Sequence, residues 1–306
     1  MSFCHSSAAF SAALSNFLMK TRHTIFMKKR IVMLLLSAAL LFWPPPVLAA
    51  EEEARVPVVM YHHISKDKSQ WNDYVVSVEE FEADLAWLAG NGWHSVGVRE
   101  LLDWYDGAGE LPDKPFMLTF DDGFESTLAY AEPLLEEYGF RGVVAVIGSA
   151  CEKFSECDEH DPEYSNLSWE DAAALAERGV IEVQCHTWDM HTVWPRAGCQ
   201  IKRGESKAAY RAALTDDLSR FLEGCAAHGV ALVPAIAYPF GAFSLETEEI
   251  VGELGFRVTF TCRERVNVLR RDEAEPLRLG RYNRPHGPGG ASFFREWEAE
   301  IQPAAK

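Results

Sequence analysis

The sequence contains no low-complexity tract, no internal repeat and no break in composition that would mark a second domain. Its 306 residues are 48% hydrophobic and 12% aromatic, which is enough to bury a large core and excludes an intrinsically disordered chain. Single α/β domains of roughly 200–250 residues are common. We therefore expect one globular domain over residues 50–306.

A hydrophobic run long enough to cross a membrane is also missing. The apolar run at residues 31–43 is shorter than the roughly 18–20 residues that a spanning helix needs, and prolines 44–46 end it. The basic stretch Met27-Lys28-Lys29-Arg30 precedes this run, and a small-residue cleavage pattern at 47–49 follows it, as in a secretory signal. We predict that residues 1–49 are a signal peptide, that translation begins at Met27, and that the mature chain is periplasmic or secreted, with no stable membrane span.

Positive charge is scarce. The net charge is −17, and the charged residues before Ala50 are all basic, five in number, so the mature chain would carry −22. Nucleic-acid binding needs a basic surface, so no nucleic-acid partner is expected. An acidic surface is compatible with a neutral or cationic polymer, although it also serves simple solubility.

No C-x-x-C pair occurs, which argues against a structural zinc site. The mature chain would keep six cysteines, and an even count in an oxidising compartment predicts disulfides. The favoured bridge joins Cys151 to Cys157 within the loop-like stretch CEKFSEC.

Short apolar runs alternate with amphipathic stretches along the chain. The apolar runs lack clean alternation, which is typical of parallel strands buried on both faces. Such alternation of strand and helix predicts a parallel α/β fold, either a barrel or an open sheet. Ser168 begins a capping-box pattern, and residues 285–290 resemble a turn-rich closing segment. The predicted strands are 56–60, 94–98, 115–120, 142–147, 180–185, 233–238 and 256–260, and the predicted helices are 77–89, 126–138, 169–178, 206–228 and 246–254.

Polar residues unsuited to a buried strand follow two of these runs. Asp121 and Asp122 end one, and His186 and His191 follow another. Carboxyl ends of parallel strands meet on one face, so these side chains should converge there. Gly123 allows a turn that brings both carboxylates to one pocket. Asp122, His186 and His191 could then bind a divalent metal with positions open for water and substrate. The metal would acidify water, and Asp121 would accept its proton.

Two further strand ends carry candidates. His62 and His63 follow the first strand, and a histidine there could protonate a leaving amine. Residues 238–241 follow another strand, and a backbone N–H in that turn could face a developing oxyanion. Taken singly, each of these motifs is more often an ordinary turn or a surface histidine. Their joint occurrence at the ends of predicted strands favours a catalytic site.

Three motifs together resemble a known family: T-F-D-D-G at 119–123, H-T-W-D-M-H at 186–191 and Y-P-F-G at 238–241. They are similar to the catalytic motifs of carbohydrate esterase family 4 (NodB homology) polysaccharide deacetylases, across nearly all of residues 56–286. The N-terminal Y-H-H-I and the five-residue histidine step resemble the branch that contains poly-β-1,6-N-acetylglucosamine N-deacetylases.

The resemblance implies a distorted (β/α) barrel and a metal-dependent enzyme that hydrolyses N-acetyl groups of N-acetylglucosamine polysaccharides outside the cytoplasm. It implies a divalent ion, typically zinc. The site residues that it implies are Asp121 as general base, Asp122, His186 and His191 as metal ligands, His62 as general acid, and Tyr238 and Phe240 at the oxyanion and substrate.

Some positions depart from the family pattern. Phe240 replaces a tyrosine that is common at this position in the family. A role played by its backbone N–H would not be affected by this change of side chain. The arginine that often precedes the third motif is missing, so Arg281 or Arg284 would have to orient Asp121. For the general acid, His63 and His286 remain alternatives to His62. Adjacent residues leaving a strand diverge, so only one of His62 and His63 should face the pocket. We choose His62 because it follows Tyr61 directly and takes the position that the resembled branch uses, and we expect His63 to face the barrel wall or a helix.

Other functions are compatible with parts of the pattern. An O-acetyl esterase acting on an acetylated polymer would use nearly the same pocket. A non-catalytic carbohydrate-binding or export-chaperone protein on a decayed scaffold should have lost at least one of Asp121, Asp122, His186 and His191. A glycoside hydrolase is disfavoured, since adjacent carboxylates cannot readily lie ~5 Å or more apart across a glycosidic bond.

Overall fold

A computed structural model describes residues 53–157, 159–271, 274–275 and 277–301. The predicted signal peptide at residues 1–49 lies outside the described residues. Within the described part of the chain, no helix is both long and apolar enough to cross a membrane.

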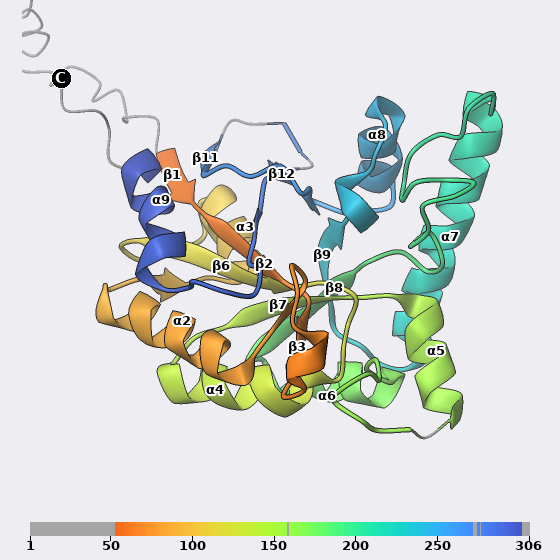
Figure 1. The fold of residues 1–306 in the computed structure, drawn as a ribbon. Helices are drawn as coiled ribbons and strands as arrows, with labels where there is room; N and C mark the ends of the chain where they lie inside the picture. The colour runs from red at the N-terminus through yellow and green to blue at the C-terminus, as the bar shows by residue number, and fades with distance from the viewer. Residues whose placement is uncertain (1–52, 158, 272–273, 276, 302–306) are drawn as a thin grey trace, which may run out of the picture. The chain divides into compact units, whose positions relative to one another are not determined.

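The centre of the fold is a curled parallel sheet with helices packed outside it (Figure 1). Every strand pair along this sheet is parallel. The strand order is β12 (Leu277–Leu279), β10 (Val258–Phe260), β9 (Leu232–Ala237), β8 (Ile181–Cys185), β7 (Gly142–Val146), β6 (Pro115–Phe120), β2 (Val58–Tyr61) and β13 (Tyr282–Asn283).

The two edge strands bring the ends of the sheet together. Only Gly280 and Arg281 separate β12 from β13, so one stretch of chain pairs with β10 at one edge and with β2 at the other. Asn267 fills the break, because its side chain binds both backbone groups of Gly280 and the carbonyl of Val56. The predicted distorted (β/α) barrel is confirmed.

Short strands flank the main sheet. β5 (His94–Ser95) pairs with β6, β1 (Glu53–Val56) pairs antiparallel with β11 (Asn267–Arg270), and β3 (His63–Ile64) pairs with β4 (Val75–Val76).

The five predicted helices are present with small shifts, and the described residues contain three more that the sequence pattern did not predict. The former are α2 (Val78–Gly90), η2 (Thr127–Ala131) with α4 (Glu132–Tyr138), α6 (Trp169–Arg178), α7 (Lys207–Ala227) and α8 (Leu245–Glu253). The latter are α3 (Val98–Tyr105), α5 (Gly148–Cys157) and α9 (Ala291–Ile301). Short turns of helix also occur at η1 (Lys68–Gln70) and η3 (Pro239–Gly241).

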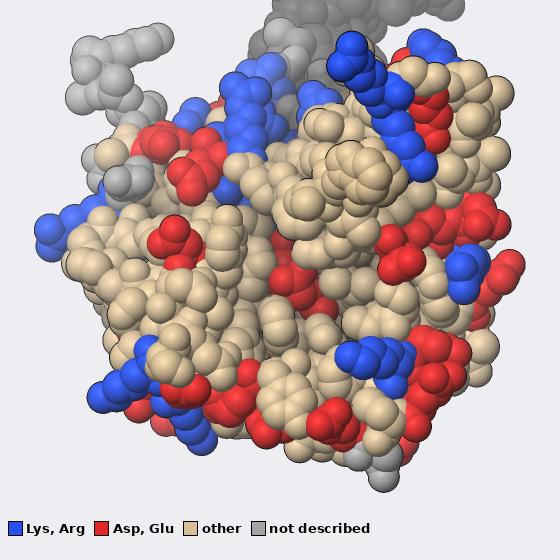
Figure 2. Space-filling model, turned by 45° about the vertical axis from the view of Figure 1, so that its right-hand side comes forward, with Lys and Arg blue, Asp and Glu red and all other residues tan. Residues whose placement is uncertain are grey.

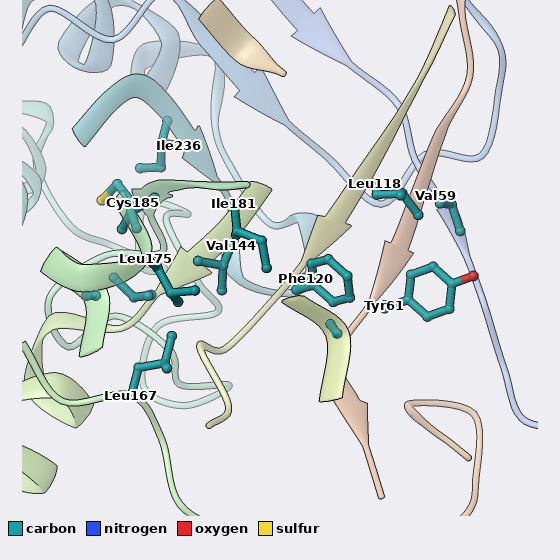
Figure 3. Close-up of a cluster of buried hydrophobic side chains, with 14 of the residues drawn as sticks. Val59, Tyr61, Leu118, Phe120, Val144, Leu167, Leu175, Ile181, Cys185 and Ile236 are labelled. Atoms are coloured by element: carbon teal, nitrogen blue, oxygen red, sulfur yellow. The ribbon is translucent and has the colours of Figure 1, made fainter. Parts of the chain in front are cut away.

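Side chains alternate between two apolar cores, which explains why the strands read as unbroken hydrophobic runs. Smaller side chains such as Val58, Met117, Val143 and Ala235 fill the barrel interior. The other face packs beneath the helices (Figure 3), with Val59, Tyr61, Leu118, Phe120, Val144, Ile181, Cys185 and Ile236 among its members. Successive side chains along a strand point to opposite faces of the sheet. Once one residue of a strand is known to face the interior, the faces of the other residues on that strand follow.

Two sequence-based boundaries are wrong for local reasons. The expected strand 94–98 stops at Ser95, because α3 starts at Val98: the Glu182 carboxylate accepts the N–H groups of Val98 and Arg99, and Glu100 accepts that of Gly97. Residues 285–290 do not close the chain, since α9 follows them and buries Phe294 and Trp297.

The predicted Cys151–Cys157 disulfide is also wrong. Both residues lie on α5, where a six-residue separation gives a rise of about 9 Å along the axis. A disulfide needs Cα atoms within about 7 Å. Cys151 is buried and Cys157 exposed, and every cysteine among the described residues is a free thiol.

The predicted capping box at the start of α6 is present. Ser168 Oγ accepts the N–H of Asp171, whose carboxylate accepts the N–H of Ser168. Ser168→Ala is expected to lower the free energy of unfolding by about 1 kcal/mol, because a helix N–H loses its acceptor. Denaturant unfolding measures the loss. Ser168→Thr keeps the hydroxyl and is the control; equal losses in the two variants would contradict a capping role.

Candidate active site

A cavity of about 670 Å³ opens at the carboxyl ends of the barrel strands. Figure 2 shows a hollow with acidic atoms at its base, bordered largely by uncharged side chains. The cavity contains every predicted site residue except Tyr238, namely His62, Asp121, Asp122, His186, His191 and Phe240.

Strand periodicity carries three of these side chains into the cavity. Met117 faces the barrel interior on β6, and Asp121 follows it in the same phase. On β2, Val58 faces the interior, so His62 continues that face beyond the strand. On β8, residues 181, 183 and 185 face the helices, which leaves His186 on the interior side.

Asp122, His186 and His191 form the candidate metal centre. Their donor atoms lie within 4.8 Å of one another, and Asp122 Oδ1 is 3.4 Å from His186 Nε2 and 3.1 Å from His191 Nε2. Asp122 adopts a φ of +69°, and Asn166 donates a hydrogen bond to its carbonyl at 2.8 Å. This left-handed turn directs the carboxylate toward the histidines.

The donor set fits a bound cation. His186 Nδ1 lies 2.8 Å from the carbonyl of Ala237, a contact that requires a proton on Nδ1. In neutral His186, Nε2 is then an acceptor that faces the Asp122 carboxylate, so the pair needs a cation or a proton between them. Burial raises the pKa of Asp122, but hydrogen bonds and charge from His186 and His191 outweigh it and hold that pKa well below its usual range. Two imidazoles and one carboxylate are a common set for divalent transition metals.

Asp121 lies in a buried ion pair with Arg281. Both carboxylate oxygens accept from the guanidinium, at 2.6 and 2.7 Å, and both side chains are almost inaccessible to solvent. Burial raises the pKa of Asp121, but the Arg281 charge outweighs it and lowers the pKa overall. The sequence left Arg281 and Arg284 as alternatives for orienting Asp121, and the structure shows that Arg281 forms the ion pair. Arg284 instead pairs with Asp84, a residue on α2.

The three histidine alternatives occupy different places. His62 lies in the cavity with its ring 5.0 Å from that of Tyr74, and its buried Nδ1 has no hydrogen-bond partner among the described residues. Burial lowers its pKa against the pull of the nearby carboxylates. His63 also lines the cavity, but both of its ring nitrogens are engaged, one with Ser126 Oγ and the other with the carbonyl of Glu163. His286 binds Glu80 and does not line the cavity.

The Y-P-F-G turn is divided between the core and the site. Tyr238 is fully buried, stacks on Phe243 and donates its backbone N–H to Phe260, so the structure places its side chain outside the cavity, against expectation. It occupies the outward phase of β9, whose Ala237 faces the interior. Phe240 has a φ of +58° and lies at the cavity wall, with its ring 4.5 Å from that of His191.

The cavity is also lined by several residues that the sequence motifs did not predict, including Tyr74, Phe124, Glu163, Tyr164 and Cys262. They lie in loops outside the recognised motifs, and nothing in the local pattern of residue types marks them. Cys262 follows β10 at the carboxyl end of the barrel, and that position alone could have indicated it.

Comparison with known proteins agrees with this architecture. Residues 108–259 match the family model described as polysaccharide deacetylase, and the chain belongs to this family. It is 26% identical over 140 residues to the poly-β-1,6-N-acetyl-D-glucosamine N-deacetylase of Escherichia coli (strain K12). That match covers 44% of this chain and 20% of the relative, so the chain spans about a fifth of the relative's length.

Solved structures give the same fold. The structure of IcaB from Ammonifex degensii superposes with a TM-score of 0.60 at 27% identity, over 74% of this chain and 91% of that one. A de-N-acetylase from Aggregatibacter actinomycetemcomitans has a TM-score of 0.68 at 20% identity, over 80% of this chain and all of that one, which supports the fold alone.

Proposed function

We propose that the protein is a divalent-metal-dependent polysaccharide deacetylase that hydrolyses N-acetyl groups of N-acetylglucosamine polymers outside the cytoplasm. The observation that carries this proposal is the pairing of two adjacent carboxylates with different partners in one cavity. Asp122 faces two imidazoles, whereas Asp121 is held ionised by Arg281. The similarity to a poly-β-1,6-N-acetyl-D-glucosamine N-deacetylase supports the substrate class.

Asp122, His186 and His191 would hold the ion, for which zinc suits this donor set. When bound, such an ion polarises the acetyl carbonyl and acidifies water in the site. Asp121 accepts a proton from the attacking water, and Arg281 keeps the carboxylate oriented and charged. Phe240 lies at the cavity wall, and its backbone N–H would donate to the carbonyl oxygen as negative charge develops.

His62 supplies a proton to the departing nitrogen. Water adds to the acetyl carbon, the carbon–nitrogen bond breaks, and the products are acetate and a free amine. An amine is a poor leaving group unless it is protonated, so the reaction needs an acid as well as a base. His62 lies in the same cavity as both carboxylates, and its buried Nδ1 has no competing partner among the described residues.

Acetate release from β-1,6-linked N-acetylglucosamine oligomers tests the proposal. The metal-loaded enzyme should release acetate, the chelated enzyme should not, and zinc should restore the activity. Acetyl xylan is the comparison substrate for ester cleavage. A preference for acetyl xylan over the amide oligomers would show an O-acetyl esterase instead. Export is a separate part of the proposal, supported by the pattern at residues 27–49; N-terminal sequencing of the mature protein checks it.

His62→Ala is expected to lower kcat by about 10²-fold, the scale of one general acid. The matched variant is His63→Ala, which alters the adjacent imidazole, whose two ring nitrogens are already engaged with Ser126 Oγ and the carbonyl of Glu163. Steady-state acetate release measures both variants at equal metal content. Near-normal turnover in His62→Ala together with its loss in His63→Ala or His286→Ala would show that the acid lies elsewhere.

A further inference from the structure

Exposed aromatic and aliphatic side chains are concentrated at the end of the barrel that carries the site. Among the described residues, seven large hydrophobic side chains are exposed, and six of them belong to segments that follow strands at this end. The seventh, Val268, lies on β11. The six are Tyr74, Tyr164, Val193, Trp194, Phe240 and Leu245.

Three of the six line the cavity itself. Tyr74 contacts His62, and Phe240 contacts His191, so aromatic rings stand beside both the proposed acid and a proposed metal ligand. Tyr164 also lines the cavity. These rings would contact the sugar unit inside the cavity.

Trp194 lies beyond the cavity lining, three residues after His191, and is 82% exposed. Val193 beside it is 72% exposed. Exposing so much apolar surface is unfavourable in water, and clustered exposed apolar side chains mark sites of binding. Isolated exposed residues are ordinary, but these two form one tip next to the site.

The loop that carries Trp194 is anchored at its base. The N–H of Gly198 and the hydroxyl of Thr192 donate hydrogen bonds across the loop, at 3.0 Å each. Arg196 is buried, lies over the ring of Tyr210 and binds Gln200 and Glu205. These contacts hold the backbone of the loop, so little backbone ordering entropy would be lost when Trp194 binds a ligand.

The same base adjoins the turn that carries Phe240. A Cβ on Gly198 would lie 2.4 Å from the carbonyl of Pro239, so the two loops are in direct backbone contact. Cys199 also donates its N–H to Ala242 at 2.8 Å. The surface from Phe240 to the Trp194 loop is therefore continuous with the Phe240 side of the cavity.

We propose that the 192–198 loop is an accessory subsite in which Trp194 stacks on a sugar of the polymer beyond the unit being deacetylated. The inference rests on the proposed function. The cavity of about 670 Å³ holds only a short part of a polymer, so flanking sugars must lie on adjacent surface. A pyranose presents C–H groups on its faces and hydroxyls at its edges, and a flat indole complements such a face. A net charge of −17 disfavours an anionic lipid surface as the occupant and tolerates neutral or cationic sugars.

Calorimetric titration with a β-1,6-linked N-acetylglucosamine pentamer and with the disaccharide tests the proposal. Trp194→Ala should weaken binding of the pentamer about tenfold, the size typical of one anchoring aromatic contact, with a much smaller effect on the disaccharide. Trp194→Tyr should recover most of the affinity. Val268→Ala removes an exposed side chain on β11 and should change neither affinity.

Several results would overturn the subsite. These are unchanged pentamer binding in Trp194→Ala, equal weakening for both ligands, and no pentamer binding by the wild type. Co-sedimentation with phosphatidylcholine and phosphatidylglycerol vesicles that depends on Trp194, with normal pentamer binding, would assign the loop to membranes instead. Acetate release by the wild type is measured separately. Its absence would reject the deacetylase function, whereas the calorimetry would still decide the subsite.

Discussion

Asp121→Asn is expected to lower kcat about 10²–10⁴-fold while the metal content stays close to that of the wild type. The asparagine keeps the shape of the side chain but cannot accept a proton from water. Asp121 binds Arg281 through both oxygens and is not one of the three clustered donors, so its loss should leave the metal centre in place. Acetate release and metal analysis of the same preparation measure the two quantities.

Asp122→Ala is the matched variant, because it changes the neighbouring carboxylate. Asp122 Oδ1 contacts both imidazoles, so this variant should lose the metal as well as turnover. Comparable metal loss in the two variants would show that the roles of the two carboxylates are wrongly assigned. Full activity of Asp121→Asn at normal metal content would exclude Asp121 as the base.

Arg281→Met is expected to lower the free energy of unfolding by about 3–5 kcal/mol, because it leaves the buried Asp121 carboxylate without its partner. Turnover should fall as well, since the pKa of Asp121 would rise once the guanidinium is gone. In the wild type the lowered pKa of Asp121 contributes stability above its unfolded pKa of about 4, and that contribution is lost as pH falls through the folded value. The difference in the free energy of unfolding between the variant and the wild type should therefore become smaller as the pH is lowered.

The chain offers a control with a similar ion pair. Arg284 pairs with Asp84 in an equally buried position, so Arg284→Met should cost comparable stability and yet retain turnover where both variants are folded. The double variant Asp121→Asn/Arg281→Met removes both charges and should be more stable than the sum of the single losses predicts. If the stability losses of the two single variants simply added up in the double variant, an interaction between Asp121 and Arg281 would be excluded. Denaturant unfolding followed by circular dichroism provides these values.

The sequence by itself determined the parallel α/β class, most strand positions and the residues of the candidate centre. Strand ends fix where polar side chains emerge, and the period of two fixes which side they face. That is why Asp121, His62 and His186 could be assigned to one pocket. The capping box at Ser168 was readable because its bonds are local.

Only the tertiary structure decided which distant groups complete the site. Arg281 and Arg284 look alike in LGRYNRP, but the break between β12 and β13 turns Arg281 onto Asp121, 160 positions away along the chain. Tyr238 belongs to a catalytic motif by resemblance, yet the outward phase of β9 buries it under Phe243. The prediction of a Cys151–Cys157 disulfide was wrong because helical geometry separates two residues that are near in sequence. Short sequence patterns can predict hydrogen bonds between neighbouring residues. Contacts across the barrel depend on how the sheet closes, and no short stretch of sequence determines that closure.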